Sequence, residues 1–130
     1  MIKILLADDY PLIREILKEY FTLNYPEIQV VGEAQNGEEA VGLCQDLKPD
    51  YVIMDIKMPI MDGITATGKI KNHSPSTKVI CYTGYRHEIL EHKALAAGAS
   101  AFFLKPFDLQ DIAGIIMQID KGEFDLYQVN

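Results

Sequence analysis

Residues 51–56 read YVIMDI, and this stretch decides the fold class. It is apolar and rich in β-branched residues, and it lacks polar residues at alternate positions. A strand of this kind is covered on both faces, as happens in a parallel sheet that helices flank on either side. Residues 78–82, which read KVICY, have the same character. We therefore predict that both segments are strands in the centre of a parallel sheet.

Short apolar runs recur outward from this centre, at residues 2–7, 28–34 and 101–104. Segments with the apolar spacing of a helix lie between and after them. The first carries a stripe from Leu12 to Phe21, and the others are expected at residues 37–47, 64–73, 86–97 and 112–119. This order is (βα)₅, which predicts an α/β fold with a doubly wound, parallel, five-stranded sheet.

The length and composition of the chain are those of one ordinary domain. The chain has 130 residues, of which 48% are apolar and 24% are charged, and it is long enough to bury a core without disulfides. We assign residues 1–120 to this domain and residues 121–130 to an extension of the last helix or the start of a linker. Cys44 and Cys81 have no metal-binding spacing, so we expect reduced, buried thiols.

Charge and hydropathy limit the kinds of partner that the chain is expected to bind. The formal net charge is −7, and no cluster of Lys and Arg offsets it, so we expect no nucleic-acid binding by this chain. The first apolar run meets two carboxylates after a few residues, which is too short for a signal peptide or a membrane span. We expect a cytoplasmic location and no membrane contact.

Reactive side chains stand at the ends of four predicted strands. Asp8 and Asp9 follow the first, Asp55 lies near the end of the third, Thr83 follows the fourth and Lys105 follows the fifth. In an open α/β sheet, chemistry takes place beyond the carboxyl ends of the strands. Taken singly, an Asp-Asp pair is also typical of a helix cap and a Thr-Gly pair of a turn. Together they predict one site.

Clustered carboxylates predict a metal. Three of them repel one another by a few kcal/mol per pair at an effective dielectric of about 20, so they require a cation. Oxygen ligands without His or thiolate indicate Mg²⁺, which also binds phosphate groups. An Asp carboxylate in such a site can attack phosphorus, while a Lys and a hydroxyl hold phosphoryl oxygens.

At these residues the chain resembles the receiver domain of bacterial response regulators, the proteins of two-component signal transduction. The matching stretches are LLADD at residues 5–9, MDIKMPIMDG at 54–63, Thr83-Gly84, AGA at 97–99 and FFLKPF at 102–107. The resemblance implies a flavodoxin-like strand order of 2-1-3-4-5, as in chemotaxis regulators. It also implies that the protein is a signalling receiver, which catalyses only its own phosphotransfer and autodephosphorylation.

The resemblance assigns roles to the site residues. Asp55 is then the phosphoacceptor. Asp9, Asp55 and the main-chain carbonyl of Lys57 bind Mg²⁺, and Asp8 helps through water. Thr83 and Lys105 contact the phosphoryl group. The peptide bond between Lys105 and Pro106 is expected to be cis.

The family's switch couples a Thr to an aromatic residue, here Thr83 and Phe102. Phosphorylation is expected to draw the hydroxyl toward the phosphoryl group and to move the ring into the vacated space. Phe102 lacks the hydroxyl of the Tyr that many members carry, so we expect the switch to depend on ring burial. The output surface would be formed by the fourth helix, the fifth strand and the fifth helix, and a homodimer could form through it. Its candidate residues are Arg86, Glu88, Glu91 and Lys93 on the fourth helix, and Asp108, Gln110, Asp111 and Gln118 on the fifth.

The implied phosphodonor is a sensor histidine kinase or a phosphotransfer protein, and the implied receiver of the signal is a downstream protein or a fused output domain. A phosphatase of the haloacid dehalogenase type is excluded, because it needs a second Asp where this chain has Lys57. A flavodoxin-like cofactor binder is disfavoured, because Asp8 and Asp9 would repel its phosphate. A receiver fold that binds partners without phosphorylation remains an alternative, as does a stand-alone or a multidomain protein.

Overall fold

Strands and helices alternate along the chain, as predicted. The computed structural model describes residues 1–85 and 88–122. The elements are β1 (Ile2–Ala7), α1 (Pro11–Asn24), β2 (Ile28–Ala34), α2 (Gly37–Leu47), β3 (Tyr51–Asp55), α3 (Gly63–His73), β4 (Lys78–Thr83), α4 (Glu88–Ala96), β5 (Ala101–Leu104) and α5 (Leu109–Asp120).

The five strands form one parallel sheet in the order β2-β1-β3-β4-β5. This is the order that the resemblance implied. Every residue of β3 is buried, and so is every residue of β4 after Lys78. The missing polar alternation in these two strands therefore had the predicted cause, which is burial on both faces.

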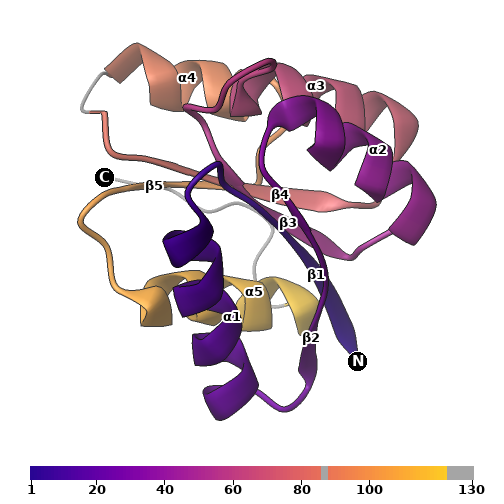
Figure 1. The fold of residues 1–130 in the computed structure, drawn as a ribbon, viewed down its shortest axis with the longest axis vertical. Coiled ribbons are helices and arrows are strands. Elements are labelled where there is room, and N and C mark those ends of the chain that lie inside the picture. The colour runs from indigo at the N-terminus through magenta and orange to yellow at the C-terminus, as the bar shows by residue number, and fades with distance from the viewer. Residues whose placement is uncertain (86–87, 123–130) are drawn as a thin grey trace.

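Helices cover the sheet on both faces (Figure 1). One layer consists of α1 and α5, whose buried side chains include Phe21 and Ile116. The other consists of α2, α3 and α4, which contribute Cys44, Ile70 and Ala94 to a second core. Both predicted thiols, those of Cys44 and Cys81, are free and buried.

The loop after β3 returns close to the strand that it leaves. The Gly63 N–H donates to the Ile56 carbonyl oxygen at 2.8 Å, and a Cβ on Gly63 would lie 2.2 Å from the main-chain oxygen of Asp55. Only glycine fits there. Asp62 caps α3 by accepting the Thr65 N–H at 2.9 Å, so this helix begins at Gly63, one residue before the prediction.

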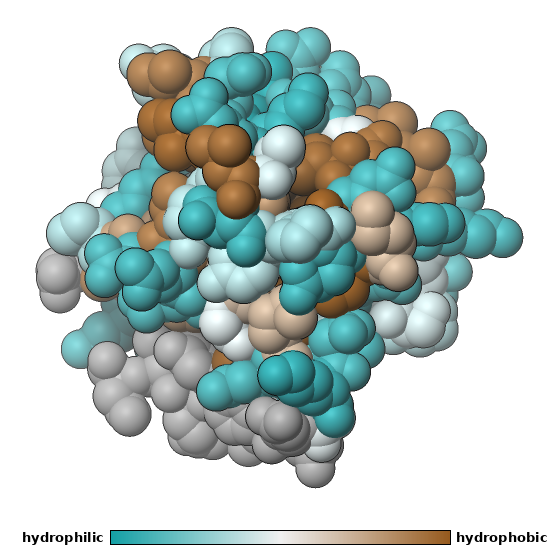
Figure 2. Space-filling view, turned by 90° about the horizontal axis from the view of Figure 1, so that it is seen from below, coloured by the Kyte–Doolittle hydropathy of each residue, from teal (hydrophilic) through white to brown (hydrophobic). Residues whose placement is uncertain are grey.

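The outer face of the α1 and α5 layer is partly apolar. Figure 2 views the molecule from below Figure 1 and shows hydrophobic surface in patches among hydrophilic ones. Leu12, Ile16 and Leu23 of α1 are exposed. A groove of about 430 Å³ lies beside α1, lined by Ile13, Ile16, Leu17, Lys105, Pro106, Phe107 and Leu109.

Some predictions fall outside the described residues. The helix expected at residues 86–97 is observed as α4 from Glu88, while Arg86 and His87 are outside the described part. So are residues 123–130, on which the expected C-terminal extension or linker depends. Among the described residues, no helix is both long and apolar enough to cross a membrane.

Candidate functional site

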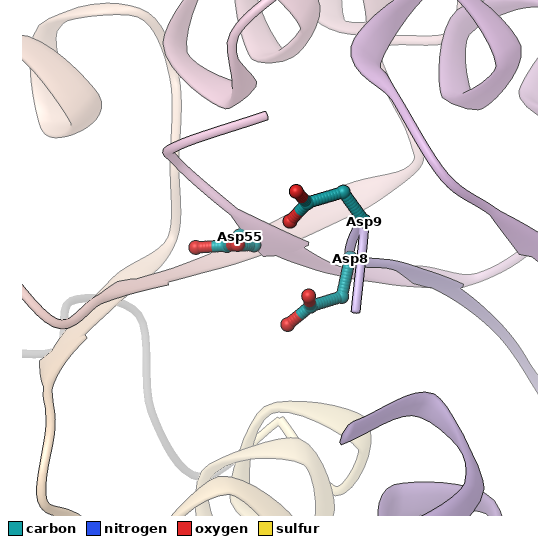
Figure 3. A group of neighbouring side chains, drawn as sticks. All are labelled: Asp8, Asp9 and Asp55. Carbon is teal, nitrogen blue, oxygen red and sulfur yellow. The ribbon is translucent and has the colours of Figure 1, made fainter. Parts of the chain in front are cut away.

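The three predicted acidic residues meet at the carboxyl edge of the sheet. Asp8 and Asp9 follow β1, and Asp55 ends the neighbouring β3, with Ala7 paired to Met54. One carboxylate oxygen from each of the three lies within 4.8 Å of the other two. Figure 3 shows the side chains of Asp8 and Asp9 extending toward the side on which Asp55 lies. Asp8 and Asp55 are buried, whereas Asp9 is exposed and opens the cluster to solvent.

The donor set fits a hard divalent cation. All three side chains offer oxygen ligands. Among the described residues, both salt bridges are made by Glu33, so no member of the cluster is in an ion pair there. Two buried carboxylates without an ion pair are costly unless a cation joins them. Oxygen-only ligands with one open side suit Mg²⁺, which keeps several waters in protein sites.

Burial and charge make Asp55 a weak acid in the metal-free site. Burial raises its pKa to about 7, with the Asp8 carboxylate adding to the rise and Lys105 opposing it. A bound divalent cation would reverse this balance, because it favours the charged form. Asp55 is therefore suited to ionise when a cation occupies the cluster.

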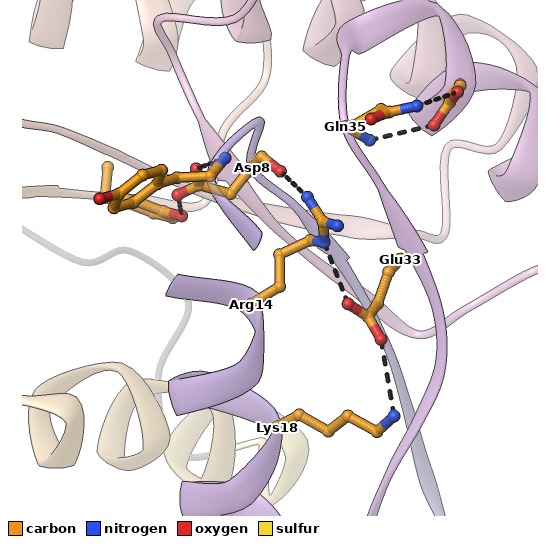
Figure 4. Close-up of polar contacts among 8 residues, drawn as sticks. Asp8, Arg14, Lys18, Glu33 and Gln35 are labelled. Atoms are coloured by element: carbon orange, nitrogen blue, oxygen red, sulfur yellow. Dashed lines mark hydrogen bonds and ion pairs between the residues drawn. The ribbon is translucent and has the colours of Figure 1, made fainter. Parts of the chain in front are cut away.

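Asp8 is held by contacts that the sequence did not reveal. Its Oδ1 accepts the Tyr10 N–H at 2.8 Å, and its Oδ2 accepts the hydroxyl of Tyr82. The Arg14 guanidinium donates to the main-chain oxygen of Asp8 at 2.6 Å and pairs with Glu33 at 3.0 Å (Figure 4). One signal could have pointed to Tyr82: a Tyr within an otherwise apolar strand needs a partner for its hydroxyl.

The predicted phosphoryl-binding groups stand on the next two strands. Thr83 is fully buried, and its Oγ1 accepts the Tyr85 N–H at 3.1 Å. The Lys105 N–H donates to the Thr83 carbonyl oxygen at 2.8 Å, which ties the ends of β4 and β5 together. The peptide bond between Lys105 and Pro106 is cis.

The predicted switch residues share one face of the sheet. Phe102 pairs with Cys81 and packs in the core beneath α2, α3 and α4. Thr83 lies two residues beyond Cys81, so its side chain points to the same face. Phe102 is 4% exposed, which means that its ring is already buried in this structure.

Two further side chains flank the cluster. Lys57 and Tyr85 come from the loops that follow β3 and β4, and the Lys57 Nζ lies 4.9 Å from the centre of the Tyr85 ring. Both side chains are exposed. This cation–π contact joins the two loops next to Asp55.

Comparisons with known proteins agree with this geometry. The model of the family described as response regulator receiver domain matches residues 4–117. The response regulator protein VraR of Staphylococcus aureus is 36% identical over 122 residues, which cover 94% of this chain and 58% of VraR.

Solved receiver domains have the same fold. The signal receiver domain of NarL from Mycobacterium tuberculosis matches with a TM-score of 0.86 at 29% identity, covering 93% of this chain and 97% of that one. A chain of the CheX-CheY-BeF₃-Mg²⁺ complex from Borrelia burgdorferi matches with a TM-score of 0.84 at 30% identity, covering 92% and 89%.

The doubly wound sheet, the acidic cluster at its carboxyl edge and these comparisons together identify the class of protein as a signalling receiver domain. This chain belongs to the response regulator receiver domain family of two-component systems. It spans 58% of the length of the curated relatives that it matches.

Proposed function

We propose that this receiver is a phosphoacceptor and that Asp55 takes the phosphoryl group from a phosphohistidine. The observation that carries the proposal is the meeting of Asp55 with Asp8 and Asp9 within 4.8 Å, at an edge that Thr83 and Lys105 also reach. A carboxylate cluster of this kind can hold a cation, which would supply the charge neutralisation and positioning that phosphoryl transfer mainly requires.

The transfer uses the side chains in separate roles. An oxygen of the ionised Asp55 carboxylate forms the new bond to phosphorus, while the bond from phosphorus to the donor nitrogen breaks and its electron pair stays on the imidazole. The Lys105 ammonium and the Thr83 hydroxyl bind phosphoryl oxygens. The later loss of the phosphoryl group to water restores Asp55, so the chain catalyses only its own modification and its reversal.

We assign the cation to Asp8, Asp9, Asp55 and the main-chain carbonyl of Lys57, with Asp8 acting through water. When bound, Mg²⁺ would neutralise the carboxylates and the charge on the phosphoryl group. The CheX-CheY complex that contains a similar chain was solved with BeF₃ and Mg²⁺, which supports this assignment.

The phosphodonor, a histidine kinase or a phosphotransfer protein in the cytoplasm, would dock beside α1. Lys105 lines the apolar groove there together with Ile16 and Phe107, so a partner seated in the groove lies next to the site. Ile16→Asp should slow transfer from a phosphohistidine donor and leave labelling by acetyl phosphate unchanged. Equal slowing of both reactions would contradict this docking.

The output would pass through Thr83 and Phe102 to the surface formed by α4, β5 and α5. Because the Phe102 ring is already buried, phosphorylation would act by moving Thr83 and selecting the buried ring position. The surface would then bind a downstream protein, a fused output domain or a second copy of the chain. Sedimentation with and without the phosphoryl group tests the homodimer, and an unchanged monomer mass in both states would exclude it.

The phosphoacceptor is tested by intact mass. The purified chain is incubated with acetyl phosphate and Mg²⁺, beside an EDTA control and an Asp55→Asn variant. A single phosphoryl adduct that needs the metal and Asp55 is expected. A folded chain that gains no adduct would instead be an interaction module that works without phosphorylation.

A further inference from the structure

Tyr82 occupies an unusual place for a core residue. It lies on β4 directly before Thr83, it is fully buried, and its side chain belongs to the core beneath α1 and α5. Its ring meets that of Phe107 edge to face, with the ring centres 5.4 Å apart. The hydroxyl at the end of this ring reaches Asp8, one of the carboxylates proposed to serve the cation.

The hydroxyl of Tyr82 leaves Asp8 little freedom. Its bond occupies Oδ2, while the Tyr10 N–H occupies Oδ1, so both oxygens of the carboxylate are anchored. The main chain of Asp8 is anchored as well, through Arg14. A carboxylate has about four lone-pair sites, so each oxygen keeps one for a cation or for water that a cation carries.

The ring of Tyr82 makes a second contact with the site. The Nζ of Lys105 lies 5.1 Å from the centre of the ring, within the range of a cation–π interaction. One side chain thus contacts both the carboxylate on the metal side and the lysine on the phosphoryl side. The hydroxyl serves the first contact and the ring serves the second.

We propose that Tyr82 is a positioning residue that holds the Asp8 carboxylate in the orientation required for Mg²⁺ binding. The proposal rests on the phosphoacceptor function given above. Hydrogen bonds to a carboxylate that ligates a metal fix its orientation, and the loss of such a partner typically costs about 10-fold to 100-fold in metal affinity. Because Asp8 reaches the cation through water, we expect the lower end of this range for Tyr82. Without the Tyr82 hydroxyl, only the Tyr10 N–H would hold the Asp8 carboxylate, and repulsion between the two buried carboxylates would favour its rotation away from Asp55.

The alternative is that Tyr82 only fills the core. Its ring would then matter for stability, and its hydroxyl would matter only because it needs a partner. The two readings differ in what happens when the hydroxyl alone is removed: a core filler changes stability, whereas a positioning residue changes the affinity for the cation.

The experiment compares Tyr82→Phe with Tyr51→Phe. Tyr51 is also a buried tyrosine in the same core, but its hydroxyl donates to the Ile116 carbonyl oxygen, at the opposite end of β3 from Asp55. Titration calorimetry with MgCl₂ should give an affinity about 10-fold weaker for Tyr82→Phe and unchanged for Tyr51→Phe. In acetyl phosphate labelling, the Mg²⁺ concentration at half-maximal rate should rise for Tyr82→Phe, while the rate at saturating Mg²⁺ stays within about twofold of the wild type.

A wild-type affinity in Tyr82→Phe would overturn this inference and leave the proposed function intact. If the wild-type chain itself binds no Mg²⁺, both fail together. The wild type also provides a readout that does not require the variant to fold: the ¹³Cζ resonance of Tyr82 should shift during the Mg²⁺ titration, and that of Tyr51 should not. A Tyr82 resonance that stays unmoved would contradict the role of its hydroxyl.

Discussion

Replacing Asp55 by Asn should stabilise the metal-free domain at neutral pH. The reason is the buried charge: Asp55 is 7% exposed and lies against Asp8, so its ionised form is disfavoured in the folded state. Asn has nearly the same shape and carries no charge at any pH. The variant therefore removes a repulsion that the wild-type chain bears whenever Asp55 is ionised.

The size of the effect follows from the pKa. Burial and the neighbouring carboxylates raise the pKa of Asp55 from 3.8 to about 7. Since the folded state binds this proton more tightly, the proton contributes stability that is fully present below about pH 4 and is lost as the pH rises to about 7. At about 1.4 kcal/mol per pKa unit, the complete loss is about 4 kcal/mol.

The assay is urea unfolding in EDTA, followed by circular dichroism at several values between pH 5 and pH 8. The advantage of Asp55→Asn over wild type in the free energy of unfolding should grow by about 2 to 3 kcal/mol across this interval. Asp46→Asn is the control, because Asp46 is an exposed carboxylate on α2. The pH dependence of Asp55→Asn is read against that of this control.

A difference between Asp55→Asn and wild type that stays flat from pH 5 to pH 8 would refute the reasoning. So would an advantage that shrinks as the pH rises. Mg²⁺ should narrow the difference, since a ligand at 100 times its Kd stabilises the folded state that binds it by about 2.7 kcal/mol. Wild type should gain this stability, and Asp55→Asn should gain less.

Three further predictions concern the loops around the site. Gly63→Ala should destabilise the fold by about 2 kcal/mol or more in urea unfolding, because the new Cβ would lie 2.2 Å from the main-chain oxygen of Asp55. The control is Gly68→Ala on α3, which should not destabilise the fold, because a Cβ there would meet open space. Ile60→Asn should raise the free energy of unfolding by about 1 kcal/mol. Ile60 is 77% exposed and has a φ of 71°, a left-handed backbone conformation that is strained for Ile and that Asn tolerates better. An unchanged or lower free energy of unfolding would contradict this backbone strain. Lys57→Ala and Tyr85→Ala should each speed the decay of the phosphorylated chain by about twofold to fivefold. This range corresponds to the loss of one exposed cation–π contact, which is worth about 0.5 to 1 kcal/mol. The double variant should decay no faster than either single variant when followed by intact mass, and fully additive rates would show that the pair does not act together.

The fold followed from the sequence because its pattern is local. Residues 51–56 show on their own that their strand is covered on both faces, since polar alternation is missing. The stripe from Leu12 to Phe21 likewise shows one helix face. Strand order required more than periodicity, because it depends on which strands pair across the chain. The resemblance supplied it, and the order is the observed one.

The site was predictable only in part. Asp8, Asp9 and Asp55 could be placed together, because the ends of parallel strands meet at one edge of the sheet. Tyr82 was missed, although its hydroxyl donates directly to the Asp8 carboxylate. Within its strand, Tyr82 resembles any other buried aromatic residue. Its hydroxyl finds a partner only because the fold brings Asp8, 74 residues earlier in the sequence, next to it.

The sequence by itself determined which segments are strands, which are helices, and which reactive groups stand at the strand ends. These properties depend on residue order alone, because side-chain period and strand length are set within a few residues. The tertiary structure alone decided the pKa of Asp55, the anchoring of Asp8 by Tyr82, and the closeness of Gly63 to the main chain of Asp55. Each of these depends on burial and on distances between atoms from separate segments, and electrostatic and hydrogen-bond energies vary steeply with both.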